Sequence, residues 1–189
     1  MLDEATTHFF FDYIDPGSYL TSQVLDGAPI VWRGFEVRVP PSPLIDPTDP
    51  DWQAYQNDVA GFARALDVEM VSPRFVPWTR KAHELGAHAR ERHCYPEVRR
   101  ALFRAHFVEG MDIGRIDLLV QIASSAGLDP SETKAALDVD RYTEAVLSDR
   151  ALGEEKGIAG VPTLVCRSKR LEGLHSPGEI QAWIRERNA

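Results

Sequence analysis

Hydrophobic and polar positions near the N-terminus predict a buried strand that leads directly into a helix. Residues 9–14 form an apolar run, rich in aromatic side chains and interrupted only by Asp12, which is typical of a buried strand. Asp15 is a favourable N-cap, and Pro16 suits the first helical position because proline has no N–H to leave unsatisfied. Such a junction directs several free main-chain N–H groups at one point, and α/β proteins commonly have their catalytic or binding sites at such points.

The next segment predicts the end of this helix, a second strand and a loop. The helix is expected to end near Asp26-Gly27, which is a favourable C-terminal stop. Residues 29–39 alternate and predict a half-buried strand, with one set of side chains inward (Val31, Phe35, Val37, Val39) and the charged set outward (Glu36, Arg38). Residues 40–50 contain five prolines in eleven residues and predict an extended surface loop.

Residues 51–155 are predicted to be almost entirely helical. Apolar side chains recur at helical spacing, and prolines and glycines divide the segment into six helices. The clearest start signal is Asp129-Pro130-Ser131-Glu132, which combines a cap, a first-turn proline and a glutamate at the third position. The predicted helices cover 51–66, 78–92, a stretch from Pro96, a stretch from Ile116 to Gly127, a stretch from Asp129, and one from Arg141 to Gly157.

The C-terminal part returns to strands. Residues 161–167 and 169–174 predict two strands, the second an edge strand with a basic start, and Ser176-Pro177-Gly178-Glu179 predicts the cap of a last helix. The chain is therefore expected to be an α/β protein in which residues 1–48 and 156–189 form one domain and residues 49–155 form an all-helical insertion.

Composition and charge narrow the classes of function. The chain has 189 residues, 43% of them hydrophobic, and a formal net charge of −8, which gives no general support for binding nucleic acid. No apolar run has the length of a membrane span, and residues 1–8 lack a secretory signal pattern, so a cytoplasmic protein is expected. The two cysteines, Cys94 and Cys166, belong to no Cys-x-x-Cys and are expected to be reduced packing thiols.

A second motif, far from the first, connects the pattern to a known family. Gly160-Val161-Pro162-Thr163 places a proline at the start of a late apolar strand, where it marks an edge or a bend and where the X-Pro bond is readily cis. Together with the strand, turn and helix near the N-terminus, it resembles the thioredoxin superfamily. The similarity is greatest to the DsbA-like branch that includes FrnE-type proteins and 2-hydroxychromene-2-carboxylate isomerases. This resemblance implies a thioredoxin-like sheet with a large helical insertion.

The resemblance also identifies a candidate site and a departure from the family pattern. Where redox members have Cys-x-x-Cys, this chain has Asp15-Pro16-Gly17-Ser18. A carboxylate cannot form a mixed disulfide and a serine cannot resolve one, so disulfide exchange through this motif is not expected. The candidate residues are Asp15 and Ser18 for catalysis and, for ligand binding, Pro16, Gly17, Tyr19, Val161, Pro162 and His175.

Three functions remain open. The first is a DsbA-family protein without a redox cysteine pair that binds a small thiol or a peptide-like ligand. The second is a glutathione-dependent isomerase or transferase using Ser18 or Asp15, although a carboxylate beside a thiolate would raise the thiol pKa. The third is a non-catalytic module that binds peptides or proteins beside Pro162. The motif at Asp15 is equally compatible with a simple helix cap.

The sequence indicates less about cofactors and partners than about the fold. His83, His88 and His93 are spaced by five residues and share no helix face, so no metal site is predicted. No cofactor is expected other than glutathione, which the resemblance leaves open, and the resemblance also leaves open a homodimer. Neither a nucleic-acid partner nor a membrane partner is expected.

Overall fold

The structure, a computed structural model, describes residues 6–188 and divides into two compact units. One unit contains the described residues up to Val37 together with those from Ser148 onward, and the other is Arg38–Leu147. The elements follow in the order β1 (His8–Phe11), α1 (Pro16–Leu25), β2 (Val31–Gly34), α2 (Pro50–Ala65), α3 (Arg80–Glu91), α4 (Tyr95–Phe107), α5 (Ile116–Ser125), α6 (Pro130–Asp138), α7 (Thr143–Glu155), β3 (Thr163–Cys166), β4 (Lys169–Glu172) and α8 (Pro177–Asn188).

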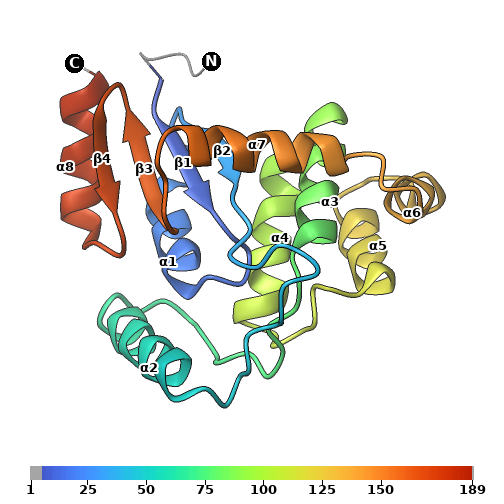
Figure 1. The fold of residues 1–189 in the computed structure, drawn as a ribbon, viewed down its shortest axis with the longest axis horizontal. Helices are drawn as coiled ribbons and strands as arrows, with labels where there is room; N and C mark the ends of the chain where they lie inside the picture. Colours follow the sequence, from blue (N-terminus) through green and yellow to red (C-terminus); the bar gives the residue numbers. More distant parts are fainter. Residues whose placement is uncertain (1–5, 189) are drawn as a thin grey trace. The chain divides into compact units, whose positions relative to one another are not determined.

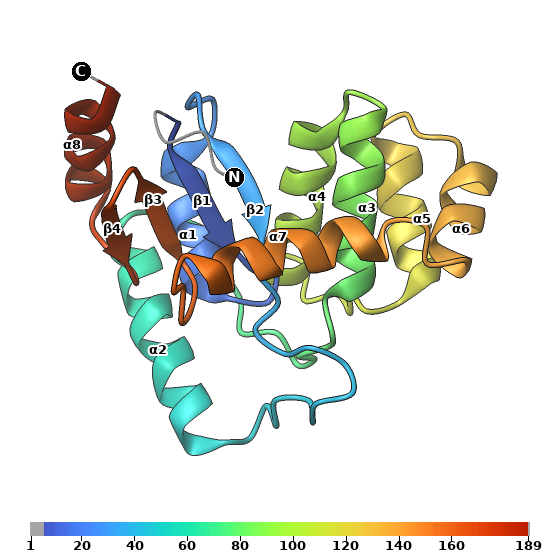
Figure 2. The same cartoon turned by 45° about the horizontal axis from the view of Figure 1, so that its top comes forward.

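The first unit is a thioredoxin-like layer structure built on a mixed sheet. Its strands lie in the order β2-β1-β3-β4, with β1 parallel to β2 and antiparallel to β3, and β4 at the edge as expected (Figure 1). Figure 2 shows α1 and α8 on one face of this sheet and the C-terminal half of α7 on the other. The predicted order of strand, helix and strand, then two strands and a helix, is confirmed.

The aromatic run of β1 forms the core on both faces of the sheet. Phe9 stacks on Phe11, with ring centroids 5.7 Å apart, and both meet Trp32 edge-on. On the opposite face Phe10 packs with Phe35 and with two other buried residues, Ile158 and Val165. Because side chains alternate along a strand, three consecutive phenylalanines supply both layers, and β1 is buried throughout.

The second strand is shorter than predicted, and the prediction of which side chains are buried was wrong at Glu36 and Val37. The ladder to β1 runs from the pair His8–Val31 to the pair Phe11–Gly34, so β2 ends with its partner. Beyond this point the alternation no longer determines burial: Glu36 is 0% exposed, whereas Val37 is 37% exposed. The carbonyl of Glu36 accepts a hydrogen bond from Arg150, a partner that the local pattern does not reveal.

The second unit is helical, as predicted, and its start signals act as expected. Asp129 caps α6 by accepting the Glu132 main-chain N–H at 2.7 Å. Within this unit α3 packs against α4, α5 and α6.

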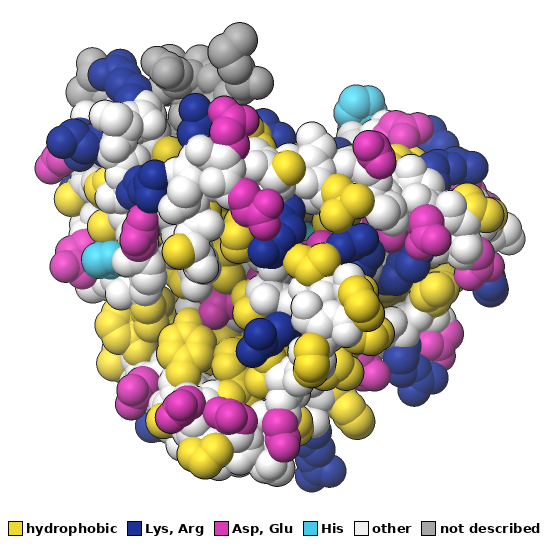
Figure 3. All heavy atoms as spheres, viewed as in Figure 1, with side chains coloured by type: hydrophobic (Ala, Val, Ile, Leu, Met, Phe, Trp, Pro, Cys, Tyr) yellow, Lys and Arg dark blue, Asp and Glu magenta, His cyan; other side chains and the backbone are white. Residues whose placement is uncertain are grey.

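Among residues 6–188, no helix is both long enough and apolar enough to cross a membrane. Acidic and basic side chains are interspersed over the face of the molecule drawn in Figure 3, so the charge of that face is mixed.

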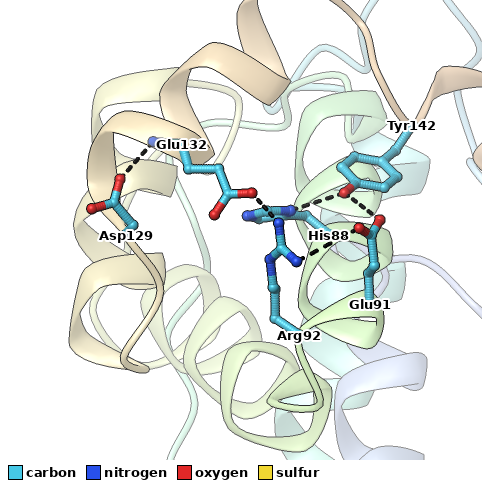
Figure 4. Close-up of polar contacts among 6 residues, drawn as sticks. All are labelled: His88, Glu91, Arg92, Asp129, Glu132 and Tyr142. Carbon is cyan, nitrogen blue, oxygen red and sulfur yellow. Dashed lines mark hydrogen bonds and ion pairs between the residues drawn. The ribbon is translucent and has the colours of Figure 1, made fainter.

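A buried histidine joins three segments of the helical unit (Figure 4). His88 of α3 is fully buried, and its Nδ1 lies 3.0 Å from the Tyr142 hydroxyl, which donates to Glu91 at 2.7 Å. Because that hydroxyl donates its only proton to Glu91, we assign the Nδ1–H of His88 as the donor to Tyr142. Arg92, at the end of α3, forms an ion pair with Glu132 of α6. The network therefore holds α3 to α6 and to the segment before α7.

This histidine makes the stability of the helical unit depend on pH. Burial lowers the pKa of His88 from its ordinary value of 6.5, and the charges of Arg92 and Arg141 lower it further, against the opposing charges of Glu132 and Glu91. As the pH falls through about 6.5, His88 therefore takes up a proton in the unfolded chain, whereas in the native chain it does so only at lower pH. The free energy of unfolding consequently falls as the pH decreases toward the native pKa. Urea unfolding between pH 7.5 and 5 is expected to show this loss.

The His88→Gln variant is expected to have a smaller slope of unfolding free energy against pH over the same range. Equal slopes for wild type and His88→Gln would show that His88 does not carry the effect.

Candidate functional site

The N-terminus of α1 is occupied by side chains of the chain itself. The Oδ2 atom of Asp15 accepts the main-chain N–H of Ser18 at 2.5 Å, and Ser18 Oγ accepts the N–H of Asp12 at 3.3 Å. Asp15 is 4% exposed and Ser18 is fully buried. Asp15 therefore caps the helix, as the sequence predicts, and both polar side chains of the motif are engaged in local hydrogen bonds.

The start of β3 lies beside the end of β1, which leads into this cap. Phe10 pairs with Thr163 in the antiparallel ladder, so Pro162 follows the register to the level of Phe11. The Val161–Pro162 peptide bond is cis, and the Pro162 carbonyl accepts the Gly173 N–H at 2.8 Å. Among residues 6–188, the main-chain N–H and carbonyl of the half-buried Val161 have no hydrogen-bond partner. The two predicted motifs thus meet at one end of the sheet.

His175 follows β4 at the same end of the sheet, but its ring contacts its own turn. Its Nε2 lies 3.0 Å from the Glu172 carbonyl oxygen, and its Nδ1 lies 4.0 Å from Glu179. Glu179 in turn accepts the Ser176 N–H at 2.9 Å, which completes the predicted cap of α8. These contacts position His175 as part of a helix start, and its place in a ligand site stays a prediction.

Asp12 connects the site to the segment after β2. Its Oδ2 accepts the Val37 N–H at 2.6 Å, and its side chain is fully buried. Asp12 is thus a residue after the end of β1 with a hydrogen bond of its own. Its partner lies 25 residues away, so the sequence could not identify it.

Both cysteines lie outside the Asp15–Ser18 motif. Cys94 and Cys166 form no disulfide, and Cys166 is buried in β3 as predicted. Cys94 lies at the N-cap of α4, where burial raises the pKa of its thiol and the neighbouring Glu97 carboxylate raises it further. Because the thiolate is the reactive species, Cys94 is a weak nucleophile at neutral pH.

The cap at Asp15 leads to a prediction about stability. Asp15→Ala removes the acceptor of the Ser18 N–H and is expected to lower the free energy of unfolding by about 1 kcal/mol. Asp15→Ser retains a capping oxygen, so its free energy of unfolding is expected to fall by less than that of Asp15→Ala. Denaturant titration of the three proteins measures this order. If Asp15→Ser were as destabilised as Asp15→Ala, the carboxylate would contribute through something other than capping.

Comparisons with known proteins agree with this architecture. The family model described as the DSBA-like thioredoxin domain matches residues 6–184. The Bacillus subtilis (strain 168) protein YwbO, which is described as uncharacterized, is 33% identical over 171 residues, which cover 82% of this chain and 84% of YwbO.

Solved structures show the same fold at lower identity. The probable DsbA oxidoreductase SCO1869 from Streptomyces coelicolor has a TM-score of 0.77 at 21% identity, over 96% of this chain and 89% of that one. A 2-hydroxychromene-2-carboxylate isomerase has a TM-score of 0.76 at 18% identity, over 96% and 93%. The cytosolic disulfide reductase DsbM from Pseudomonas aeruginosa, solved with GSH, has a TM-score of 0.71 at 17% identity, over 96% and 98%. The family model that matches residues 6–184, together with the 33% identity to YwbO, shows that this protein belongs to the DSBA-like thioredoxin domain family.

Proposed function

We propose that this protein binds a thiol-containing or peptide-like ligand at the end of the sheet where α1 and β3 begin, and that it does not exchange disulfides there. The observation that carries this proposal is the main chain of Val161. Its N–H and carbonyl have no partner among the described residues, and it precedes the cis bond to Pro162. An extended peptide that pairs with this residue would satisfy both groups.

The cap of α1 supports the second half of the proposal. Redox members of the family need a thiolate where the helix N–H groups stabilise it. Here the Asp15 carboxylate already accepts one of those N–H groups, and no thiol belongs to the motif. The ligand would therefore meet a fixed negative charge instead of a nucleophile. We also propose that the protein is cytoplasmic, because glutathione is the main small thiol of that compartment.

A glutathione-dependent isomerase or transferase is the second candidate. The DsbM structure with GSH supports reduced glutathione as the first ligand to test. Against catalysis, the Ser18 hydroxyl is buried and accepts the Asp12 N–H, and the Asp15 carboxylate would raise the pKa of a thiol beside it. A non-catalytic peptide-binding module would use the same Val161 groups, and it would be favoured by peptide binding that requires no thiol.

Calorimetric titration of reduced glutathione into wild type and two Asp15 variants tests the proposal. We expect saturable binding to the wild type and tighter binding to Asp15→Ser, because that variant removes the charge near the ligand thiol while keeping a cap. Asp15→Ala separates the loss of charge from the loss of the cap. Asp129→Ser changes the matched Asp-Pro cap of α6 and is expected to bind like wild type. Absence of saturable binding in wild type and both Asp15 variants would contradict a thiol ligand.

A further inference from the structure

The helical unit contains a pocket that the proposed thiol site does not use. It has a volume of about 530 Å³, and all of its lining residues belong to the unit Arg38–Leu147. This volume lies within the usual range of small-molecule sites. The lining combines apolar and charged side chains, namely Pro40, Leu44, Pro77, Trp78, Arg80, Lys81, Asp112, Gly114, Arg115, Asp140 and Thr143.

One wall of the pocket is apolar and partly in contact with water. It consists of Pro40, Leu44, Pro77 and Trp78. The Leu44 and Trp78 side chains are 50% and 39% exposed, although both are large and apolar. Covering this wall with an apolar ligand would be favourable, because apolar surface would leave its contact with water.

The apolar wall is held in place by contacts within the unit. The indole Nε1 of Trp78 donates a hydrogen bond to the Ser42 carbonyl at 2.9 Å, which orients the ring. Gly114 approaches Pro77 so closely that a Cβ on it would lie 2.6 Å from the Pro77 Cβ. A ligand would therefore meet a wall that is already ordered, so little conformational entropy would be lost on binding.

The cations at the start of α3 already have partners in the chain. The Lys81 ammonium lies 3.1 Å from Oε1 of Glu84, whose side chain is 0% exposed, and it also pairs with Asp140. The pKa of Asp140 is lowered by the hydrogen bond from Lys81 and further by the charge of Arg80, so both cations act on the same carboxylate. This part of the lining is therefore neutralised by the protein itself.

The charged groups at the start of α5 are engaged in the same way. Arg115 holds Asp117 through two hydrogen bonds, from Nε to Oδ1 at 3.1 Å and from Nη2 to Oδ2 at 2.6 Å. The Oδ1 atom of Asp112 accepts the Gly114 N–H at 3.0 Å. An ionic ligand would give up its hydration here and would have to compete with these partners, which is costly for an anion and for a cation alike.

We propose that this pocket binds a small neutral ligand with a flat apolar body. The flat body would lie against the rings of Trp78 and Pro77, because aromatic and ring-shaped groups pack well on an indole face. The ligand carries no charge, because the charged side chains of the lining are matched within the chain. This site is separate from the thiol site and does not depend on it.

Isothermal titration with three naphthalene derivatives tests the proposal. They share one ring system and differ in charge: 2-naphthylmethanol is neutral, 2-naphthoate is an anion, and 2-naphthylmethylamine is a cation at pH 7. We expect one saturable site for the alcohol and binding at least about tenfold weaker for each ion. In ¹H–¹⁵N correlation spectra, the indole N–H signal of Trp78 is expected to shift and saturate with the alcohol. The loss of one indole signal in Trp78→Leu identifies it.

Trp78→Leu and Phe75→Leu form a matched pair of variants. Trp78→Leu is expected to weaken binding of the alcohol about tenfold or more, because it removes the aromatic wall. Phe75 is an aromatic residue nearby in the sequence, is 52% exposed and does not line the pocket, so Phe75→Leu is expected to bind like wild type.

Three results would overturn the proposal. They are the absence of saturable alcohol binding to wild type, binding of either ion as tight as that of the alcohol, and equal binding by Trp78→Leu and Phe75→Leu. A Trp78 indole signal that stays unchanged at saturation would also place the ligand elsewhere. Asp15→Ser is expected to leave binding of the alcohol unchanged, so a failure of the thiol site would be seen separately.

Discussion

Replacing Asp15 and Ser18 together by cysteine is expected to give the protein the ability to reduce insulin disulfides. The two positions are the N-cap and the third residue of α1, and the Asp15 carboxylate already accepts the Ser18 N–H. A cysteine at position 15 would place its sulfur near the same N–H and the positive end of the helix, which lowers the thiol pKa to about 7.5 or below. The second cysteine would resolve the mixed disulfide.

The expected gain is at least about tenfold in the rate of insulin reduction by dithiothreitol, because the lowered pKa raises the ionised fraction of the new thiol near neutral pH well above that of an ordinary cysteine. Asp15→Cys alone is the matched control: it is expected to form a mixed disulfide with oxidised glutathione, releasing one reduced glutathione, but not to turn over. Insulin reduction by the wild type that survived Cys94→Ser and Cys166→Ala would contradict the chemistry assigned to this motif.

Truncating Phe10 to alanine is expected to have the largest effect on stability. Phe10 is 0% exposed and packs with Phe35, Ile158 and Val165 between the sheet and α7. Removing its ring leaves a cavity, and such changes lower the free energy of unfolding by about 3–5 kcal/mol. Urea unfolding followed by circular dichroism measures this loss.

Phe75→Ala provides the matched control for Phe10→Ala. Phe75 is the same residue type but is 52% exposed, so its truncation is expected to change stability by no more than about 0.5 kcal/mol. Similar losses for the two variants would show that Phe10 does not form the core described above.

Local signals account for most of what the sequence predicted correctly. Asp15-Pro16 and Asp129-Pro130 start helices through side-chain caps that involve residues within three positions, and Ser176 and Glu179 form their cap in the same way. All four residues of β1 are buried. The burial of this strand could therefore be predicted without knowing how it pairs with its neighbours. These features depend on neighbours in the chain, which a sequence displays directly.

The features that the sequence missed depend on distant partners. The strand around residue 36 was predicted too long because its ladder ends with β1, and the Val37 N–H bonds to Asp12 across 25 residues. The bond between His88 and Tyr142 spans 54 residues. One pocket of the helical unit is lined by residues of the proline-rich loop and of the starts of α3 and α5. These segments lie far apart in the sequence, so no local pattern indicates that they meet.

The main-chain amide of Val161 is the most direct reporter of ligand binding at the thioredoxin-like unit. A titration of ¹⁵N-labelled protein with reduced glutathione, followed by ¹H–¹⁵N correlation spectra, measures its chemical shift. We expect the Val161 amide to be among the most shifted and to saturate, and mass spectrometry of a parallel sample treated with oxidised glutathione to show no mixed disulfide. A Val161 amide that does not move at saturating glutathione, or a covalent glutathione adduct, would contradict the proposed function.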